Sequence, residues 1–255
     1  MKKLKIGFLI DENIVDYYVW DLICYVNKSE LFEAPILITG YKKKKKNLKQ
    51  KIISLFNRNI FLTINLILKF VLSNFIKKLE YQPTINKFPN YEKKFDITKI
   101  FKDKKISVAG EWSKSGIYLN FKESDIKKIS SINLDCVIRC GSGILKGKIL
   151  DIFPFGILSF HHGDNRVIRG GPSGFWEVLN NHPSTGFIIQ KLNDELDGGD
   201  VFVRGNIMTE KFWSLNNAQL LEKSNIFFKE LLNKIAINGS LPLVEKKINL
   251  KKKNI

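Results

Sequence analysis

Apolar runs and polar breaks alternate along the start of the chain in the pattern of an open parallel sheet. Residues 3–10 form an apolar run of strand length, a polar break follows, and apolar residues recur at helical spacing from Ile14 to Val26. A second apolar run, residues 35–40, restores the strand pattern. Strand, helix and strand in this order predict a βαβ unit. No GxGxxG follows the first strand, so the usual dinucleotide site is not predicted.

The segment 41–95 interrupts this rhythm. Five lysines, Lys42 to Lys46, precede an apolar stretch from Ile52 to Ile76 that is predicted to be helical, and Pro83 and Pro89 are expected to end the segment. Lys69 in the middle makes spanning a bilayer costly. Two interpretations stay open: a helix packed on the domain or on a second subunit, and a helix lying on a membrane surface.

The sheet pattern resumes further along the chain. Strands are predicted at residues 105–110, 134–140, 157–161 and 185–192, with helices at 144–150, 174–180 and 216–235. The result is an α/β fold with a Rossmann-like, open, mostly parallel sheet. We expect a catalytic domain of residues 1–210, in which 41–95 is a basic, apolar helical insertion. Residues 211–255 would form a C-terminal helix and a basic tail on the same domain.

The composition narrows the class of protein. The formal net charge is +17, but only five of the 42 basic residues are arginine, so solvated lysines explain most of the charge and no nucleic-acid partner is predicted. The three cysteines form no zinc-type pair and no disulfide framework, so no metal site is predicted. Without a secretory signal, a reducing cytoplasm is the expected location.

The candidate chemistry centres on His161 and His162, which lie in a segment rich in glycine and arginine. His161 ends a predicted strand, and open sheets bind ligands outside the carboxyl ends of their strands. Asp197 follows 36 positions later in a turn with Gly198 and Gly199. A carboxylate beside an imidazole raises the pKa of the ring and fixes its tautomer, as acid–base catalysis requires. The alternative is that His161 is structural.

The segment 156–201 resembles the core of the folate-dependent formyltransferase family, which includes methionyl-tRNA and sugar-nucleotide formyltransferases. The resemblance extends from about Leu134 to Asn206, is weaker in the first strand, and is absent from Tyr41 to Tyr91. It rests on several motifs in order: Ser159-Phe160-His161, Arg169-Gly170, Pro172 with Trp176, Thr185-Gly186, and Asp197-Gly198-Gly199.

This resemblance implies a fold of the formyltransferase type and transfer of a formyl group from 10-formyltetrahydrofolate to a primary amine. His161 would handle protons and contribute to the oxyanion site, and Asp197 would orient His161 and relay the proton. The residues implied to lie beside the folate are Arg139, Cys140, Gly141, Ser142, Gly143, Ile144, Leu145 and Asp194.

One departure from the family pattern concerns the catalytic asparagine, which is Ser159 here. Loss of an oxyanion donor costs roughly 100- to 1000-fold in rate. Either His162, Asn165 or a backbone N–H replaces it, or the protein is repurposed. The loop after His161 also differs and predicts a distinct acceptor. The residues assigned to substrate binding are His162, Asp164, Asn165, Arg166, Arg169 and Gly170.

The predicted acceptor is an amino sugar carried on a nucleotide, for surface polysaccharide or lipopolysaccharide biosynthesis. Relatives acting on methionyl-tRNA carry a further nucleic-acid-binding domain, for which the 55 residues after Asp200 leave no room. The glycinamide-nucleotide branch lacks the motif order found here. The alternative is a non-catalytic or repurposed binding protein that docks on membranes, and a homodimer stays open.

Overall fold

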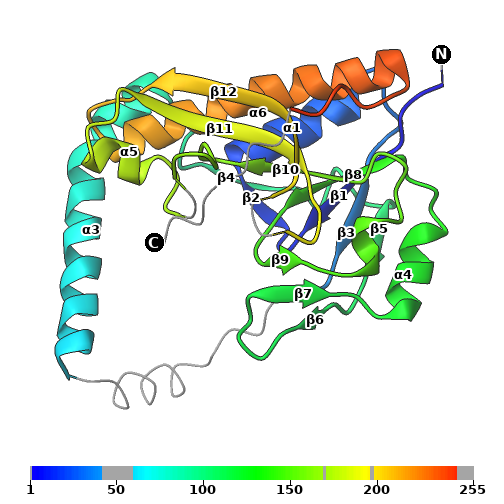
Figure 1. The fold of residues 1–255 in the computed structure, drawn as a ribbon, viewed down its shortest axis with the longest axis horizontal. Helices are drawn as coiled ribbons and strands as arrows, with labels where there is room; N and C mark the ends of the chain where they lie inside the picture. The colour runs from blue at the N-terminus through cyan, green and yellow to red at the C-terminus, as the bar shows by residue number, and fades with distance from the viewer. Residues whose placement is uncertain (1, 42–59, 169–170, 196–197, 246–255) are drawn as a thin grey trace.

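The computed structural model describes residues 2–41, 60–168, 171–195 and 198–245, and these form one α/β body (Figure 1). The strands are β1 (Ile6–Ile10), β2 (Ile14–Asp16), β3 (Ile36–Thr39), β4 (Lys94–Asp96), β5 (Lys105–Ser107), β6 (Glu111–Trp112), β7 (Tyr118–Asn120), β8 (Cys136–Cys140), β9 (Ile144–Leu145), β10 (Ile157–His161), β11 (Ser184–Lys191) and β12 (Asp200–Met208). The helices are α1 (Tyr17–Lys28), α3 (Ile60–Lys87), α4 (Glu123–Ser130), α5 (Phe175–Leu179) and α6 (Trp213–Asn238), with a 3-10 turn, η1 (Lys148–Leu150).

Seven strands form the main sheet in the order β12-β11-β10-β8-β1-β3-β5. The five strands from β10 to β5 are parallel, whereas β11 and β12 run antiparallel at one edge. The strands β1 and β8 lie inside the sheet and read as continuous apolar runs because both of their faces are covered. The predicted open, mostly parallel sheet is confirmed.

Two hydrophobic cores cover the two faces of this sheet. On one face, Leu22 of α1 and Phe228 of α6 pack against residues such as Ile138 and Leu158. On the other face, Ile126 of α4 packs against Val137 and Ile157. The residues of each strand therefore alternate between the two cores, as the pleat requires.

The helix α3 extends away from the sheet for much of its length (Figure 1). Its last turns are fixed to α6 by Glu80, which is 7% exposed. The Glu80 carboxylate accepts hydrogen bonds from the N–H groups of Trp213 (3.3 Å) and Ser214 (2.7 Å), the first two residues of α6. A carboxylate at this position satisfies donors that a helix N-terminus leaves without partners.

Replacing Glu80 with alanine should lower the free energy of unfolding by about 1–2 kcal/mol, because α6 loses its cap. Urea unfolding of both proteins measures the difference. The control is Glu222→Ala, which removes an exposed carboxylate of α6 and should change stability by less than about 0.5 kcal/mol. Equal stabilities of the Glu80 variant and the wild type would contradict the capping role.

Three local predictions were wrong. Ile14 to Asp16 were predicted to be helical but form β2, which pairs with β4 about 80 residues away. Residues 144–150 form β9 and η1 instead of a helix, because β9 pairs with β7. Pro83 lies inside α3 and does not end it. The turn around Pro83 is held by the Thr84 hydroxyl, which donates to the Glu80 carbonyl (2.7 Å).

The predicted helical residues 52–59 lie outside the described residues, as do Lys42 to Lys46 and the end of the tail.

Candidate functional site

The carboxyl ends of three neighbouring parallel strands meet at one edge of the sheet. Asp11 directly follows β1, Gly141 follows β8, and His161 is the last residue of β10. Open α/β sheets bind their ligands outside the carboxyl ends of the strands. This edge, which we call the strand-end site, is therefore the candidate functional site.

Asp11 and Arg139 form a buried ion pair at the strand-end site. The Arg139 Nη1 lies 2.9 Å from the Asp11 Oδ1. The Arg139 side chain is 3% exposed and the Asp11 side chain is 13% exposed. The same Nη1 donates to the Tyr41 hydroxyl (2.6 Å) and the Leu9 carbonyl (3.2 Å). The Ser142 N–H donates to the Asp11 Oδ2 (2.7 Å). The pair therefore ties β1 to β8 and fixes the loop after β8.

The same ion pair sets the charge of Asp11 and restricts position 141. Burial alone would raise the pKa of Asp11, but the Arg139 charge and the hydrogen bonds from Ser142 outweigh burial and hold this pKa below its ordinary value. A Cβ on Gly141 would come within 2.3 Å of both the Arg139 Nη1 and the Asp11 Oδ1. Position 141 needs glycine because the backbone closely approaches the ion pair.

The strand β10 places Ser159 and His161 on one face and Phe160 on the other, because side chains alternate along a strand. Phe160 packs in the core beneath α1 and α6. His162 follows it there: its ring stacks on Phe160 at 5.2 Å, and its Nε2 lies 3.1 Å from the Ser224 hydroxyl of α6. His161 alone of the two histidines therefore belongs to the strand-end site.

The burial of His162 should make the protein less stable at mildly acidic pH. Burial, with the nearby His161, lowers the pKa of His162 to about 3, so the folded protein does not bind the proton that the unfolded chain binds near pH 6.5. The stabilisation is complete above pH 6.5 and is lost as the pH falls toward 3. At pH 5 the loss is about 2 kcal/mol.

Urea unfolding at pH 7 and pH 5 measures this loss. His162→Gln should lack it, because glutamine does not titrate, while His182→Gln serves as the matched control and should retain it. An equal pH dependence in the wild type and in His162→Gln would contradict the assignment.

The loop after β10 is held by its own ion pairs. Asp164 is 7% exposed and accepts from Arg166 Nη2 (2.8 Å) and Arg204 Nη1 (2.6 Å). Burial would raise the pKa of Asp164, but the hydrogen bonds from Arg166 and the charge of Arg204 outweigh it and lower the pKa. Arg204 also donates to the Asn165 Oδ1 (3.2 Å) and pairs with Glu245 (2.8 Å). Asp164 and Asn165 thus support the loop, and Arg166, with a side chain 35% exposed, is an accessible cation in its described part.

The Thr185-Gly186 motif connects this loop to α5 and α6. The Asn216 Nδ2 of α6 donates to the Thr185 hydroxyl (2.9 Å) and to the Gly174 carbonyl (2.9 Å). A Cβ on Gly186 would lie 2.7 Å from the Asp164 Cβ. The motif therefore stabilises the fold: Thr185 accepts a hydrogen bond from the buried Asn216, and Gly186 has no side chain that would clash with Asp164.

The structure brings only part of the predicted site together. Ser159, His161 and the segment 139–145 meet at the strand-end site. Within that segment Gly141, Ser142 and Gly143 are exposed and Leu145 is buried, while burial raises the pKa of the Cys140 thiol to about 12. Arg169, Gly170 and Asp197 lie outside the described residues.

Of the remaining predicted folate residues, Ile144 is half-buried in β9. Asp194 is exposed, and its Oδ1 lies 3.8 Å from the Lys146 ammonium.

Two residues of the site, Asp11 and Gln190, were not predicted from the sequence. Asp11 directly follows the first predicted strand, which is the position where polar ligand contacts concentrate. Gln190 lies opposite Ser159 in β11.

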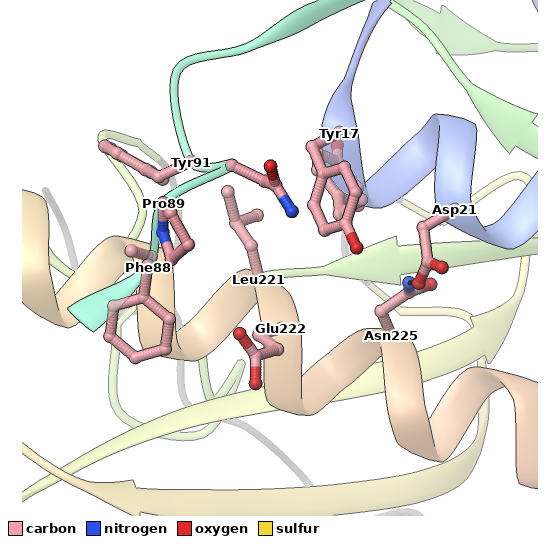
Figure 2. A pocket seen from close by; sticks show the side chains of 11 residues that line it. Tyr17, Asp21, Phe88, Pro89, Tyr91, Leu221, Glu222 and Asn225 are labelled. Atoms are coloured by element: carbon pink, nitrogen blue, oxygen red, sulfur yellow. Dashed lines mark hydrogen bonds between the residues drawn. The ribbon is translucent and has the colours of Figure 1, made fainter. Parts of the chain in front are cut away.

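A separate small hollow of about 110 Å³ lies between α1, α6 and the segment after α3 (Figure 2). Tyr17, Phe88 and Leu221 contribute apolar walls to it. Its Asp21 carboxylate already accepts from the Asn225 Nδ2 (2.7 Å) and the Lys229 ammonium. None of the residues that line this hollow belongs to the strand-end site, so the two are separate.

A mostly parallel sheet that ends in an antiparallel pair, with its polar edge at β1, β8 and β10, is the fold of the formyltransferases. A phosphoribosylglycinamide formyltransferase from Brucella melitensis superposes with a TM-score of 0.59 at 10% identity, covering 96% of this chain and 100% of that chain. An N-formyltransferase from Helicobacter canadensis, solved with folinic acid and dTDP-3-aminofucose, superposes with a TM-score of 0.55 at 9% identity, covering 98% and 70%.

The sequence similarity also points to formyltransferases. A methionyl-tRNA formyltransferase from Prochlorococcus marinus is 32% identical over 127 residues, which are 49% of this chain and 38% of that protein. The chain thus spans less than two fifths of this relative's length. No family model matches the sequence. The resemblance to formyltransferases inferred from the motifs is confirmed.

Proposed function

We propose that the chain is a folate-dependent N-formyltransferase, which moves the formyl group of 10-formyltetrahydrofolate to a primary amine. The observation that carries the proposal is the position of His161 at the carboxyl end of β10, on the same face as Ser159 and beside the loop after β8. The sequence similarity to a methionyl-tRNA formyltransferase supports it.

The residues of the strand-end site fit a folate. The backbone of residues 141–143 is exposed next to His161's strand, and its N–H and C=O groups suit a pterin ring that carries both donors and acceptors. The Arg139 Nε is a buried donor without a hydrogen-bond partner among the described residues. The folate supplies the formyl group, and the chain binds and orients it.

In this proposal His161 accepts a proton from the amine, which must lose it after attacking the formyl carbon. Asp197 keeps the imidazole in the tautomer that can accept the proton. The Asp11–Arg139 pair holds the folate loop in place, because Asp11 accepts from the Ser142 N–H. The cytoplasm, where folate and nucleotide-linked sugars occur together, is the location that this function requires.

For the acceptor we propose an amino sugar linked to a nucleotide, used for surface polysaccharide. The N-formyltransferase from Helicobacter canadensis, solved with dTDP-3-aminofucose, has the same fold. The Arg166 side chain, in the loop after β10, is 35% exposed. Its Nε and Nη2 bond Asp164, which fixes the guanidinium in place, and its charge can attract a diphosphate.

A panel of acceptors tests the proposal. The protein is incubated with 10-formyltetrahydrofolate and, in turn, nucleotide-linked amino sugars, glycinamide ribonucleotide and methionyl-tRNA, and the products are weighed by mass spectrometry. We expect a formyl mass on amino sugars only. Formylation of glycinamide ribonucleotide or methionyl-tRNA alone would contradict the acceptor, and no formylation at all would contradict the activity.

A second candidate function, docking on an anionic membrane surface, is favoured by α3. Its described side chains include a stripe of large apolar residues that are 54–63% exposed and recur at helical spacing: Ile64, Ile67, Leu68, Val71, Leu72, Phe75 and Leu79. The net charge of +17 complements anionic lipid and opposes pairing with a second copy. No helix in the described part of the chain is long and apolar enough to cross a membrane.

Sedimentation with vesicles tests the membrane contact. Vesicles with one third phosphatidylglycerol should bind the protein, and the double substitution Leu68→Glu, Leu72→Glu should weaken binding by about tenfold or more, because it places charge on the apolar stripe. Pure phosphatidylcholine vesicles are the control. Unchanged binding by the variant would contradict docking through α3, and a dimer in light scattering would indicate a second copy there.

A further inference from the structure

A row of three polar side chains crosses the sheet at the strand-end site. Ser159 is paired with Arg139 of β8 on one side and with Gln190 of β11 on the other. Side chains opposite one another in neighbouring strands point to the same face, with Cβ atoms about 4.5–5.5 Å apart. Ser159, the shortest of the three, lies in the middle of the row.

Two buried atoms on either side of Ser159 have no hydrogen-bond partner among the described residues. One is the Arg139 Nε, a donor, and the other is the Gln190 Oε1, an acceptor. Arg139 and Gln190 are each 4% exposed. A buried polar atom without a partner is costly and calls for an explanation, such as a group that binds there during function.

The surroundings of Gln190 connect it to the predicted acid–base turn. A Cβ on Gly199 would lie 2.8 Å from the Gln190 Oε1 and 2.4 Å from the Lys191 carbonyl. The Gln190 amide therefore lies against the backbone of Gly199, two positions after Asp197 in the sequence. It lies between Ser159 and Gly199.

We propose that Gln190 is a substrate-positioning residue, whose amide oxygen holds the attacking amine beside Ser159. The inference rests on the proposed formyl transfer. The Gln190 Oε1 accepts an N–H of the amine while the nitrogen attacks the formyl carbon. The new bond joins the amine nitrogen to the formyl carbon, the bond from that carbon to the folate nitrogen breaks, and His161 passes the proton to the folate nitrogen. Gln190 forms no covalent bond.

The substitution Gln190→Met tests this role, because methionine keeps the length of the side chain and removes the amide. We expect kcat to fall about 10- to 100-fold with the affinity for 5-formyltetrahydrofolate within about threefold of the wild type. The melting temperature should rise by about 2–4 °C, because an unpaired buried oxygen is removed. The matched control Lys191→Met, one position along the strand, should leave kcat within about twofold.

Rescue completes the test. Ser159→Asn in the Gln190→Met background places an amide at the adjacent position and should return kcat to within about fivefold of the wild type. A merely structural Gln190 would instead lower the melting temperature when replaced, and Ser159→Asn would not rescue; either result overturns the inference. If the wild type is active and Gln190→Met has an undiminished kcat, the inference about Gln190 is overturned and the proposed function is not. A wild type without turnover on any acceptor overturns the proposed function and the inference together.

Discussion

Asp11→Ala should lower the free energy of unfolding by about 3–5 kcal/mol, the largest stability effect expected of a single substitution at the strand-end site. The substitution leaves the Arg139 guanidinium, which is 3% exposed, without its carboxylate. It also removes the acceptor of the Ser142 N–H. A buried charge that loses its partner keeps the cost of its desolvation, whereas an exposed charge is solvated again by water.

Chemical denaturation of the wild type, the Asp11 variant and two control variants shows whether the effect is specific to this buried pair or follows the loss of an exposed ion pair as well. Asp16→Ala removes the exposed partner of Lys94 and should cost less than about 1 kcal/mol. The double variant Asp11→Ala, Arg139→Met should recover part of the loss, since no unpaired charge remains. An Asp11 variant no less stable than the Asp16 variant would contradict a buried, energetically coupled pair.

His161→Gln should lower kcat/KM for formyl transfer by about 100- to 10,000-fold, because glutamine can bond its neighbours but cannot accept the proton of the amine. His161 is half-buried at the end of β10, so the fold should tolerate glutamine there. His182→Gln, a change of the same kind outside the strand-end site, should retain full activity. Steady-state kinetics measures the effect, and circular dichroism establishes that both variants are folded.

An undiminished rate in His161→Gln would place the proton transfer elsewhere. The neighbouring His162 cannot substitute easily, because its ring lies on the opposite face of the sheet and its Nε2 is bonded to Ser224. We therefore expect that only one histidine of the pair, His161, takes part in proton transfer.

The framework of the fold could be predicted because its strands are continuous apolar runs. The runs that became β1, β3 and β8 are buried over most of their length, and β10 begins with two buried apolar residues, so each stands out from the polar segments around it. The stripe of α6 is equally clear, since Leu220, Phe228 and Ile235 recur at helical spacing and are fully buried.

The small sheets could not be predicted from local pattern. The strands β2, β4, β6, β7 and β9 are two or three residues long, too short to show a period. The pairings of β2 with β4 and of β7 with β9 join segments that lie far apart along the chain, as with Ile14 and Asp96. Tertiary pairing decided the conformation of these segments and overrode the helical spacing that begins at Ile14.

Part of the candidate site could also be predicted from the sequence, and part of it could not. The end of a strand predicted the position of His161, but the partner of Arg139 lies 128 residues away and no spacing connects the two. The assignment of His162 to the substrate could have been avoided, because adjacent residues of a strand point to opposite faces. The same rule identifies Gln190 once β10 and β11 are known to pair.

The most direct test of the central claim is the release of tetrahydrofolate from 10-formyltetrahydrofolate, measured with and without a pool of nucleotide-linked amino sugars. We expect release that requires the amine and is abolished by His161→Ala and by Asp197→Ala. Release that does not need an amine, or that survives both substitutions, would contradict formyl transfer at the strand-end site.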